Sequence, residues 1–305
     1  FLINKSKEIL KKNIMLVVNP ISGDMDKSEF VDATAVFAKK ENLNLVIYNT
    51  SGISDIENIK VLYKTYTPKR IIVVGGDGTI KMVAEAMEEQ DVIIGILPAG
   101  SANGLAVDLN FPTTIEENLE IAFHHDYMEI DMISINGKKS IHLSDLGINA
   151  EMIKNYENGS IRGKWGYALQ TLSTLIDLEA PFIATITGDF PTVECEARMI
   201  VIANSKKYGT GVSINPNGVM DDGKFELVIL KNMDLVVLGK IITGNMPIDV
   251  NDVEIISTDK AFVTTNIPVS FQIDGEYCGK ETKLNIEILP KQMKVAIPLA
   301  NSKVT

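Results

Sequence analysis

The first 126 residues alternate between short apolar runs and stretches in which apolar residues recur every three or four positions. The runs predict buried strands, and the spaced residues predict amphipathic helices. Strands that alternate with helices predict a doubly wound, mostly parallel sheet. The predicted strands are residues 14–18, 43–48, 71–74 and 92–97. Helices are expected around residues 30–37, from a capping box at 54–57, after residue 79, from about residue 102, and from a second capping box at 114–117.

The pattern changes after about residue 126. Two apolar runs flank Asn136-Gly137, which is a strong signal for a β-hairpin. One long helix with Trp165 on its apolar face is expected next. Short β-rich runs follow at 182–187, 197–203, 225–230, 261–265, 269–273, 284–288 and 294–297. They predict an antiparallel, sandwich-like second domain. We therefore expect an α/β domain over residues 1–126 and a β-rich domain over residues 127–289, with residues 290–305 packing back on the first.

Composition narrows the possible partners. The chain has 305 residues and a formal net charge of -11. This balance argues against nucleic-acid binding and disfavours broad adhesion to anionic membranes. No apolar run approaches ~20 residues, so no transmembrane helix is expected, and the lysine-rich first twelve residues do not resemble a signal peptide. Two cysteines, Cys195 and Cys278, favour a reducing cytoplasm over a disulfide framework. The histidines, His124, His125 and His142, lack partners at the spacing of a zinc site and are expected to be solvated or internally satisfied.

The motif Gly75-Gly76-Asp77-Gly78-Thr79 follows a predicted strand and leads into a helix. Glycines allow a tight turn and close approach of a ligand, and the helix N-terminus adds positive potential, so the loop suits a polyphosphate. A carboxylate beside phosphates repels them unless it holds Mg²⁺ or accepts the proton of an attacking hydroxyl, and Asp77 therefore indicates phosphoryl transfer. The motif is neither a Walker A loop nor a GxGxxG dinucleotide fingerprint.

Three glycine-rich blocks together carry a family resemblance. Asn19-Pro20 with Ser22-Gly23, the motif at 75–79, and residues 98–106 (Pro-Ala-Gly-Ser-Ala-Asn-Gly-Leu-Ala) resemble the diacylglycerol kinase catalytic-domain family, which includes sphingosine kinases and bacterial soluble lipid kinases. The resemblance continues at residues 145–150, 221–225 and 271–276, so it covers nearly the whole chain. It implies two domains with ATP in the cleft between them.

The resemblance also assigns residues to the nucleotide. It implies contacts from Asn19, Pro20, Ser22, Gly23, Thr50, Gly75, Gly76, Asp77, Gly78, Thr79 and Ser101, with Asn103 supporting the third block. The family pattern there is usually Gly-Thr-x-Asn-Asp, whereas this chain has Ser101 for the threonine and Gly104 for the aspartate. The Gly-Ser-x-Asn-Gly form looks closer to the sphingosine kinase-like branch, which puts diacylglycerol itself in doubt as the substrate.

Further carboxylates lie in Asp-Gly turns, which are common in hairpins whatever the function. The resemblance implies that the turn Asp274-Gly275-Glu276 faces the cleft, with Glu276 as proton acceptor and Asp274 as its acid-base partner or a metal ligand. Glu276 and Asp77 are both candidate bases, because either could reach the substrate hydroxyl. The resemblance also implies an Mg²⁺ site away from the phosphates, formed by the Asp222 carboxylate and backbone carbonyls near Val219 and Lys224, since Mg²⁺ prefers oxygen ligands.

Two basic segments have alternative interpretations. Arg162, Lys164 and Trp165 could form a basic and aromatic cluster at the mouth of a lipid site, although a tryptophan at this spacing is more often part of the core. The segment Lys206-Lys207-Tyr208 followed by Gly209 to Gly211 could cover the cleft, although an exposed turn is the commoner outcome for such a sequence.

These observations predict a cytoplasmic lipid kinase that uses Mg²⁺ and ATP, contacts the membrane transiently at its surface, and phosphorylates a diacylglycerol-like or sphingoid lipid; a homodimer is compatible with the sequence. One alternative is an NAD kinase, which shares the GGDGT motif but typically carries an Asn-Glu pair in the next block, absent from residues 100–104. A second is a non-catalytic nucleotide- or lipid-sensing module, against which Asp77, Asp274 and Glu276 argue.

Overall fold

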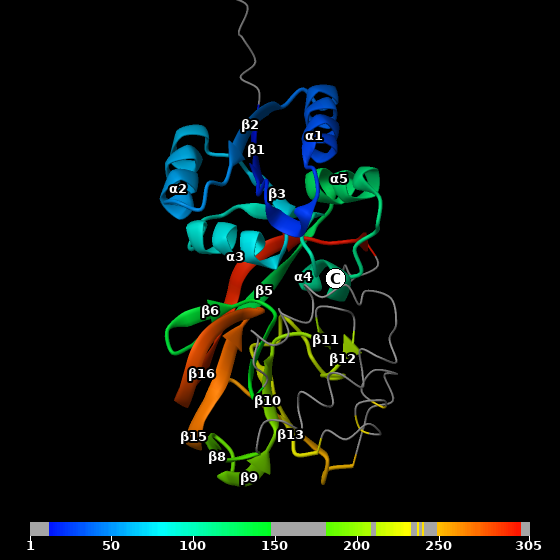
Figure 1. The fold of residues 1–305 in the computed structure, drawn as a ribbon. Helices are drawn as coiled ribbons and strands as arrows, with labels where there is room; N and C mark the ends of the chain where they lie inside the picture. Colours follow the sequence, from blue (N-terminus) through cyan, green and yellow to red (C-terminus); the bar gives the residue numbers. More distant parts are fainter. Residues whose placement is uncertain are drawn as a thin grey trace, which may run out of the picture. The chain divides into compact units, whose positions relative to one another are not determined.

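The computed structural model describes residues 12–147, 181–208, 212–232, 237, 240 and 249–299 (Figure 1). By its internal contacts the chain forms two compact units. Unit 1 contains Phe1–Ser101, Phe111–Met128 and Met293–Thr305, and unit 2 contains Ala102–Asn110 and Glu129–Gln292. Each unit is described by itself.

Unit 1 is built on a parallel sheet. Its strands are β1 (Asn13–Val18), β2 (Asn44–Asn49), β3 (Arg70–Gly75) and β4 (Ile93–Pro98), in the spatial order β2-β1-β3-β4. Residues Lys294 and Val295, near the end of β16 (Glu276–Ala296), pair in parallel with β4. Parallel pairing on both sides of β1 requires crossover connections, which the helices supply.

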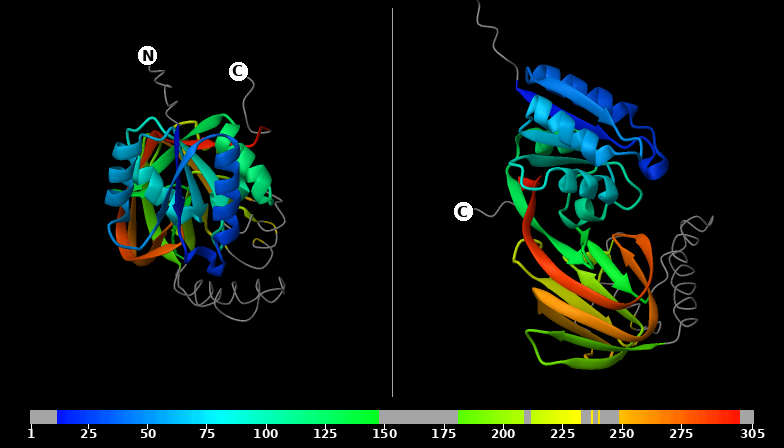
Figure 2. Two further views of the ribbon diagram at one scale, coloured as in Figure 1. Left: turned by 90° about the horizontal axis from the view of Figure 1, so that it is seen from above. Right: turned by 90° about the vertical axis from the view of Figure 1, so that its left-hand side faces the viewer.

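Four helices cover this sheet. Helices α1 (Ser28–Lys40) and α5 (Ile115–His124) lie on one face, and α2 (Asp55–Tyr66) and α3 (Asp77–Ala86) lie on the other, as the two views in Figure 1 and the left panel of Figure 2 show. The strands are apolar along nearly their whole length because both faces are covered. Leu16, Ile72 and Leu97 are fully buried and pack with Leu119 of α5.

The two predicted capping boxes differ in outcome. At α5, the Thr114 hydroxyl accepts the amide of Glu117 at 3.4 Å, as predicted. At α2, the predicted box at Ser54 is wrong, because Ser54 is left-handed and makes no capping hydrogen bond. The helix begins at Asp55, and the Asp55 carboxylate instead accepts the amides of Ser51 and Gly52 in the preceding loop.

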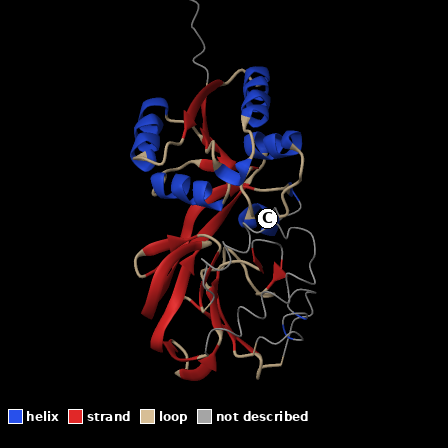
Figure 3. Ribbon diagram, in the orientation of Figure 1, coloured by secondary structure: helices blue, strands red, loops and turns tan. Residues whose placement is uncertain are grey.

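Unit 2 is rich in antiparallel strands. Its main sheet has the order β14-β13-β10-β7-β15-β16, and β8 and β9 extend from β15. The bounds are β7 (Leu143–Leu146), β8 (Phe182–Gly188), β9 (Val193–Ala197), β10 (Met199–Ala203), β13 (Phe225–Leu230), β14 (Val253–Thr258) and β15 (Lys260–Ile273). A short separate pair joins β11 (Lys207–Tyr208) to β12 (Val212–Ser213). The predicted fold class, a parallel α/β domain followed by an antiparallel β-rich domain, is therefore confirmed, and Figure 3 shows the contrast between the two units.

The hairpin predicted at Asn136-Gly137 joins β5 (Tyr127–Ile135) to β6 (Lys138–Ser140). Both turn residues have positive φ, at 50° and 82°, as the tight hairpin turn requires. Strands β10 and β13 are buried on both faces. Their alternate side chains enter two separate apolar clusters, one with Phe225 and the other with Val228.

Two predictions of strand length are wrong. The runs at 261–265 and 269–273 belong to the single strand β15, which is interrupted by a register shift between Thr264 and Val269. The runs at 284–288 and 294–297 likewise lie on the 21-residue strand β16, apart from Ile297, which follows its end. A β-bulge breaks the alternation of side chains without ending the strand, so one strand resembles two in the sequence.

The units also divide the chain differently from the predicted boundary at residue 126. Residues 102–110, which include α4 (Gly104–Asp108), belong to unit 2. They do so because the Asp108 carboxylate accepts two backbone amides of unit 2, one from Lys207 at the start of β11 and one from Lys206 just before it. The predicted long helix around Trp165 lies outside the described residues.

Candidate active site

The predicted phosphate loops of unit 1 gather at the carboxyl ends of its parallel strands. The chain runs from β1 to β2 on one side and then returns to β3 on the other side of β1. Connections therefore leave β1 and β3 in opposite directions. In open α/β sheets such a reversal creates the crevice in which ligands bind. Asn19 follows β1 and Gly76 follows β3, so two of the three glycine-rich blocks start at this point.

Asn19 joins two of the blocks. Its amide nitrogen Nδ2 donates to the Thr79 hydroxyl at 3.1 Å, and its backbone amide donates to the Val74 carbonyl at 3.0 Å. Its Oδ1 accepts the amide of Ile21 at 3.2 Å, which turns the loop back after Pro20. Asn19 thus shapes the first loop and fixes it to the second.

The second block forms a close turn into α3. A Cβ on Gly75 would lie 2.6 Å from the Thr79 hydroxyl oxygen, so the turn has room only for glycine. Gly76 is the N-cap residue and Asp77 is the first helical residue, half-buried. The turn therefore presents the positive end of a ten-residue helix beside a carboxylate.

The third block contacts the first. Gly23 has a φ of 64°, and a Cβ there would lie 2.8 Å from the backbone carbon of Gly100. The amide of Ala99 donates to the Gly75 carbonyl at 2.9 Å. Thr50, after β2, donates its amide to the Val18 carbonyl at 2.8 Å. The structure thus brings together the predicted residues at 19, 20, 22, 23, 50 and 75–79 at one end of one sheet, with residues 99 and 100 of the third block beside them.

Ser101 and Asn103 lie in the middle of this third block. Ser101 is exposed and is the last residue of its segment in unit 1. Asn103 has a φ of 53° and precedes α4 as its N-cap residue, in unit 2. Apart from glycine, asparagine is one of the residues that adopt this left-handed backbone conformation most readily.

Lys27 supports the first loop and was missed from the sequence. It is only 5% exposed, and its ammonium donates to the carbonyl oxygens of Ser22 at 2.5 Å and Met25 at 3.0 Å. Burial lowers the pKa of Lys27. Nothing in the sequence separates this lysine from its exposed neighbours, because its burial results from how the loop folds over it.

In unit 2 the candidate acceptor residues lie on a tight hairpin turn. Asp274 and Gly275 have φ values of 49° and 84°, and Ile273 pairs with Glu276 across the turn. The carboxylate of Asp274 accepts the Ser140 hydroxyl at 2.8 Å and the amides of Ile141 and His142 at 3.2 and 3.0 Å. Glu276 is exposed. Asp274 therefore binds the segment between β6 and β7, while the Glu276 side chain faces solvent in this structure.

A buried amide contact supports the same turn. Gln272 is 2% exposed, and its Oε1 accepts the amide of Gly275 at 2.5 Å. Its Nε2 donates to the carboxylate of Asp145, which is fully buried on β7. These two residues belong to the motifs at 145–150 and 271–276, so the structure gives both motifs a common role in holding the turn.

The predicted metal ligands lie on the loop before β13. The Asp222 carboxylate accepts the amide of Lys224 at 3.0 Å, and Val219 is partly exposed. Asp131, 1% exposed, accepts the Gly223 amide at 2.7 Å and donates its own amide to the Met220 carbonyl at 2.8 Å. The set of one carboxylate and two carbonyl groups fits Mg²⁺ chemically. Among the described residues no group of three or more acidic, histidine or cysteine side chains could hold a metal ion.

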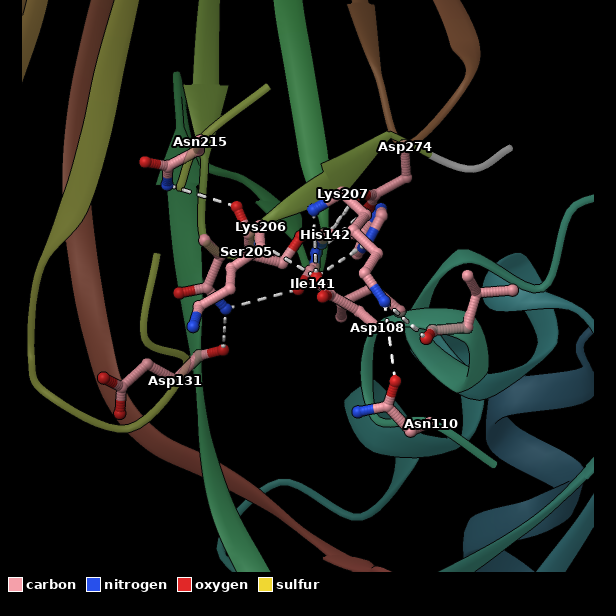
Figure 4. Close-up of polar contacts among 12 residues, drawn as sticks. Asp108, Asn110, Asp131, Ile141, His142, Ser205, Lys206, Lys207, Asn215 and Asp274 are labelled. Carbon is pink, nitrogen blue, oxygen red and sulfur yellow. Dashed lines mark hydrogen bonds and ion pairs between the residues drawn. The ribbon is translucent and has the colours of Figure 1, made fainter. Parts of the chain in front are cut away.

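Two further residues were not predicted as a pair. His142 and Asp108 approach each other within unit 2, with Nε2 and Oδ2 3.6 Å apart and both side chains buried (Figure 4). The backbone amides of Lys206 and Lys207 bind the same Asp108 oxygen, so this segment is fixed through its backbone. The candidate cluster at Arg162, Lys164 and Trp165 lies outside the described residues, as do Gly209 to Gly211.

Comparison with known families agrees with these motifs. The diacylglycerol kinase catalytic domain matches residues 13–135, and the YegS C-terminal NAD kinase beta sandwich-like domain matches residues 145–297. The chain belongs to the family that carries this YegS C-terminal domain, here preceded by a diacylglycerol kinase catalytic domain. These matches confirm the resemblance inferred from the three glycine-rich blocks. The match to a kinase catalytic domain identifies the chain as kinase-like.

Individual relatives match most of this chain. A protein of Yersinia pestis named "Probable lipid kinase YegS-like" is 28% identical over 270 residues, which are 85% of this chain and 89% of that protein. One of the same name from Shewanella frigidimarina is 26% identical over 247 residues, 75% of this chain and 76% of its own. A crystal structure of a diacylglycerol kinase from Bacillus anthracis superimposes with a TM-score of 0.74 at 20% identity, covering 95% of this chain and 98% of that one. This last similarity shows the fold.

Among the described residues, no helix is long and apolar enough to cross a membrane.

Proposed function

We propose that the protein is a lipid kinase that transfers the γ-phosphate of ATP to a hydroxyl group of a diacylglycerol-like or sphingoid lipid. The observation that carries the proposal is the hydrogen bond from Asn19 to Thr79. It fastens the loop after β1 to the turn of GGDGT, at the strand reversal where α/β sheets bind nucleotides. The family match and the names of the relatives support a lipid as the acceptor class.

The chemistry assigns roles to named groups. The acceptor oxygen forms a bond to the γ-phosphorus, the bond from that phosphorus to the β–γ bridging oxygen breaks, and ADP leaves. The proton of the acceptor hydroxyl passes to a carboxylate, either Glu276 or Asp77. The amides at the start of α3 stabilise the charge on the phosphates. The bonds of Asp274 to residues 140–142 support a role in setting the geometry of the turn.

Magnesium has two expected places in this proposal. When bound beside the triphosphate it would neutralise charge on the transferring group. A second ion would be held by the Asp222 carboxylate with carbonyl oxygens of Val219 and Lys224, a set of hard oxygen ligands. Asp131 binds the loop that carries these atoms, so it would hold the ligands in place.

The test is transfer of labelled γ-phosphate from ATP to defined acceptors. The panel contains diacylglycerol and a sphingoid base, each in detergent micelles, and NAD in solution. We expect label on at least one lipid and none on NAD. Label on NAD alone would establish the NAD kinase alternative, for which the sandwich-like C-terminal domain offers a structural parallel. No transfer to any acceptor, with ATP bound in a filter assay, would identify a sensing module.

A further inference from the structure

A buried acid and a buried histidine meet in unit 2. Oδ2 of Asp108 lies 3.6 Å from Nε2 of His142, and the two side chains are 4% and 7% exposed. The separation is longer than a hydrogen bond, and the two groups carry opposite charges only when the imidazole is protonated. Burying two such polar groups is unfavourable unless each has hydrogen-bond partners, so we consider the contacts of each residue in turn.

Asp108 is well provided with partners. The same Oδ2 accepts the backbone amides of Lys206 at 2.9 Å and Lys207 at 3.2 Å (Figure 4). Burial alone would raise the pKa of Asp108, but His142, Ser205 and the Lys207 amide outweigh it and hold the pKa below its usual value. Asp108 is therefore an anionic anchor at the end of α4.

His142 connects this anchor to the acceptor turn. Its side chain faces Asp108, while its backbone amide donates to Oδ1 of Asp274 at 3.0 Å. Its carbonyl also accepts the amide of Asn204 at 3.0 Å, which ties it to the end of β10. One residue thus links α4 to the turn that carries Glu276.

We propose that Asp108 and His142 are positioning residues, whose buried pair fixes residues 140–142 and thereby sets the Asp274–Glu276 turn for the acceptor hydroxyl. The proposal rests on the proposed function for its kinetic consequence. Its structural part, the control of the Ser140–His142 segment by the pair, does not depend on any substrate.

The position of the pair predicts which kinetic constant it affects. The pair lies in unit 2, whereas the loops at 19–23 and 75–79 lie in unit 1. A disturbed acceptor turn should lower kcat, because geometry errors near the reacting groups act mainly on the transition state. The KM for ATP should change little.

The experiment compares two substitutions at one position. His142→Leu removes the side-chain donor, and His142→Gln replaces it with an amide nitrogen at a similar reach. We expect His142→Leu to lower kcat by about tenfold, because it takes away the polar group that faces the buried Asp108 carboxylate, and His142→Gln to restore most of the loss. Hydrogen exchange at the Ile141 and His142 amides, the donors to Asp274, should accelerate in the Leu variant and slow again in the Gln variant.

A matched control is His124→Leu. His124 also lies near a carboxylate, Glu41 at 3.8 Å, but its side chain is 39% exposed and belongs to unit 1. It should leave kcat and the exchange rates unchanged. Should His142→Leu not fold, Asp108→Asn serves in its place, because it removes the charge while keeping the shape and an oxygen for the two amides.

The outcomes separate this proposal from the function on which it rests. If the unmodified protein phosphorylates no lipid, the proposed function fails, but exchange still tests the pair. Unchanged exchange at residues 141 and 142 in the Leu variant overturns the positioning role. So does a kcat within about twofold of the unmodified enzyme, or an equal loss in the Leu and Gln variants.

Discussion

The side chain of Asn19 donates a hydrogen bond of 3.1 Å to the hydroxyl of Thr79, and so joins the loop after β1 to the first turn of α3. Asparagine and threonine here come from two motifs far apart in the sequence. The bond is part-buried, and Thr79 is only 4% exposed, so its hydroxyl has little access to water that could replace the lost partner. The relative position of two predicted phosphate loops therefore depends on it.

Thr79→Val should weaken nucleotide binding, because valine matches the shape of threonine but cannot accept from Asn19. We expect the KM for ATP to rise by about tenfold, the usual worth of a hydrogen bond whose partner stays buried. Thr79→Ser keeps the hydroxyl and should stay within about threefold of the unmodified enzyme. Steady-state kinetics at saturating lipid would measure both, and equal KM values for the Val and Ser variants would contradict the role of the bond.

Asp77→Asn tests the carboxylate at the start of α3. Asparagine keeps the size of the side chain, so ATP binding should persist, whereas a lost proton acceptor or metal ligand should lower kcat by about a hundredfold or more. Glu29→Gln is the matched control, since Glu29 lies in the first turn of α1 and should not affect the reaction. Full activity of Asp77→Asn would leave Glu276 as the remaining candidate base.

Gly23→Ala should destabilise the fold through a backbone clash. The added Cβ would lie 2.8 Å from the Gly100 carbon and 2.9 Å from the Ala99 oxygen, at a φ of 64°. Gly52→Ala provides the control, because Gly52 also has a positive φ, 81°, but a Cβ there meets nothing within 4 Å. Strain alone costs about 1 kcal/mol at such a position.

We therefore expect the loss of unfolding free energy for Gly23→Ala to exceed that for Gly52→Ala by about 1–3 kcal/mol, a typical cost of overpacking. Urea denaturation measures both. Losses of equal size would mean that the contact between the first and third glycine-rich blocks relaxes without cost.

The features that sequence patterns predicted correctly are those with local causes. The parallel strands were predicted from short apolar runs. Asn136-Gly137 predicted the hairpin because the tight turn needs two consecutive residues with positive φ, and few residue pairs other than Asn-Gly adopt that conformation readily. The GGDGT motif lies at the start of α3, as expected. Both signals for this turn are local, namely the glycines and the helical spacing of the apolar residues that follow them.

The features that were missed depend on residues distant in sequence. Asp108, His142 and Asp131 are buried because other segments cover them, and a local pattern cannot distinguish them from surface residues. Ser54 failed as a cap for a local reason, because its backbone is left-handed. Asp55 offers a stronger acceptor one residue later, and it binds the preceding loop rather than the amides of its own helix.

Asp55 gives a prediction about pH. Its carboxylate accepts the Tyr48 hydroxyl at 2.6 Å and the amides of Ser51 and Gly52 at 2.9 and 2.7 Å, and the residue is 7% exposed. Burial would raise the pKa of Asp55, but these hydrogen bonds to the charged form outweigh burial and lower it. A lowered pKa in the folded state means that the carboxylate stabilises the fold at every pH above its unfolded value, about 3.9.

Asp55→Asn should therefore reduce the unfolding free energy at pH 7 by about 1–3 kcal/mol. The difference from the unmodified protein should shrink as the pH falls below about 4, because protonated aspartate and asparagine then carry the same charge. Urea denaturation from about pH 7 to about pH 3 measures this difference. Asp32→Asn, at an exposed site on α1, should show a small difference throughout. A difference for Asp55→Asn that stays constant over this range would mean that the charge of Asp55 does not hold the loop after β2, and that its shape alone does.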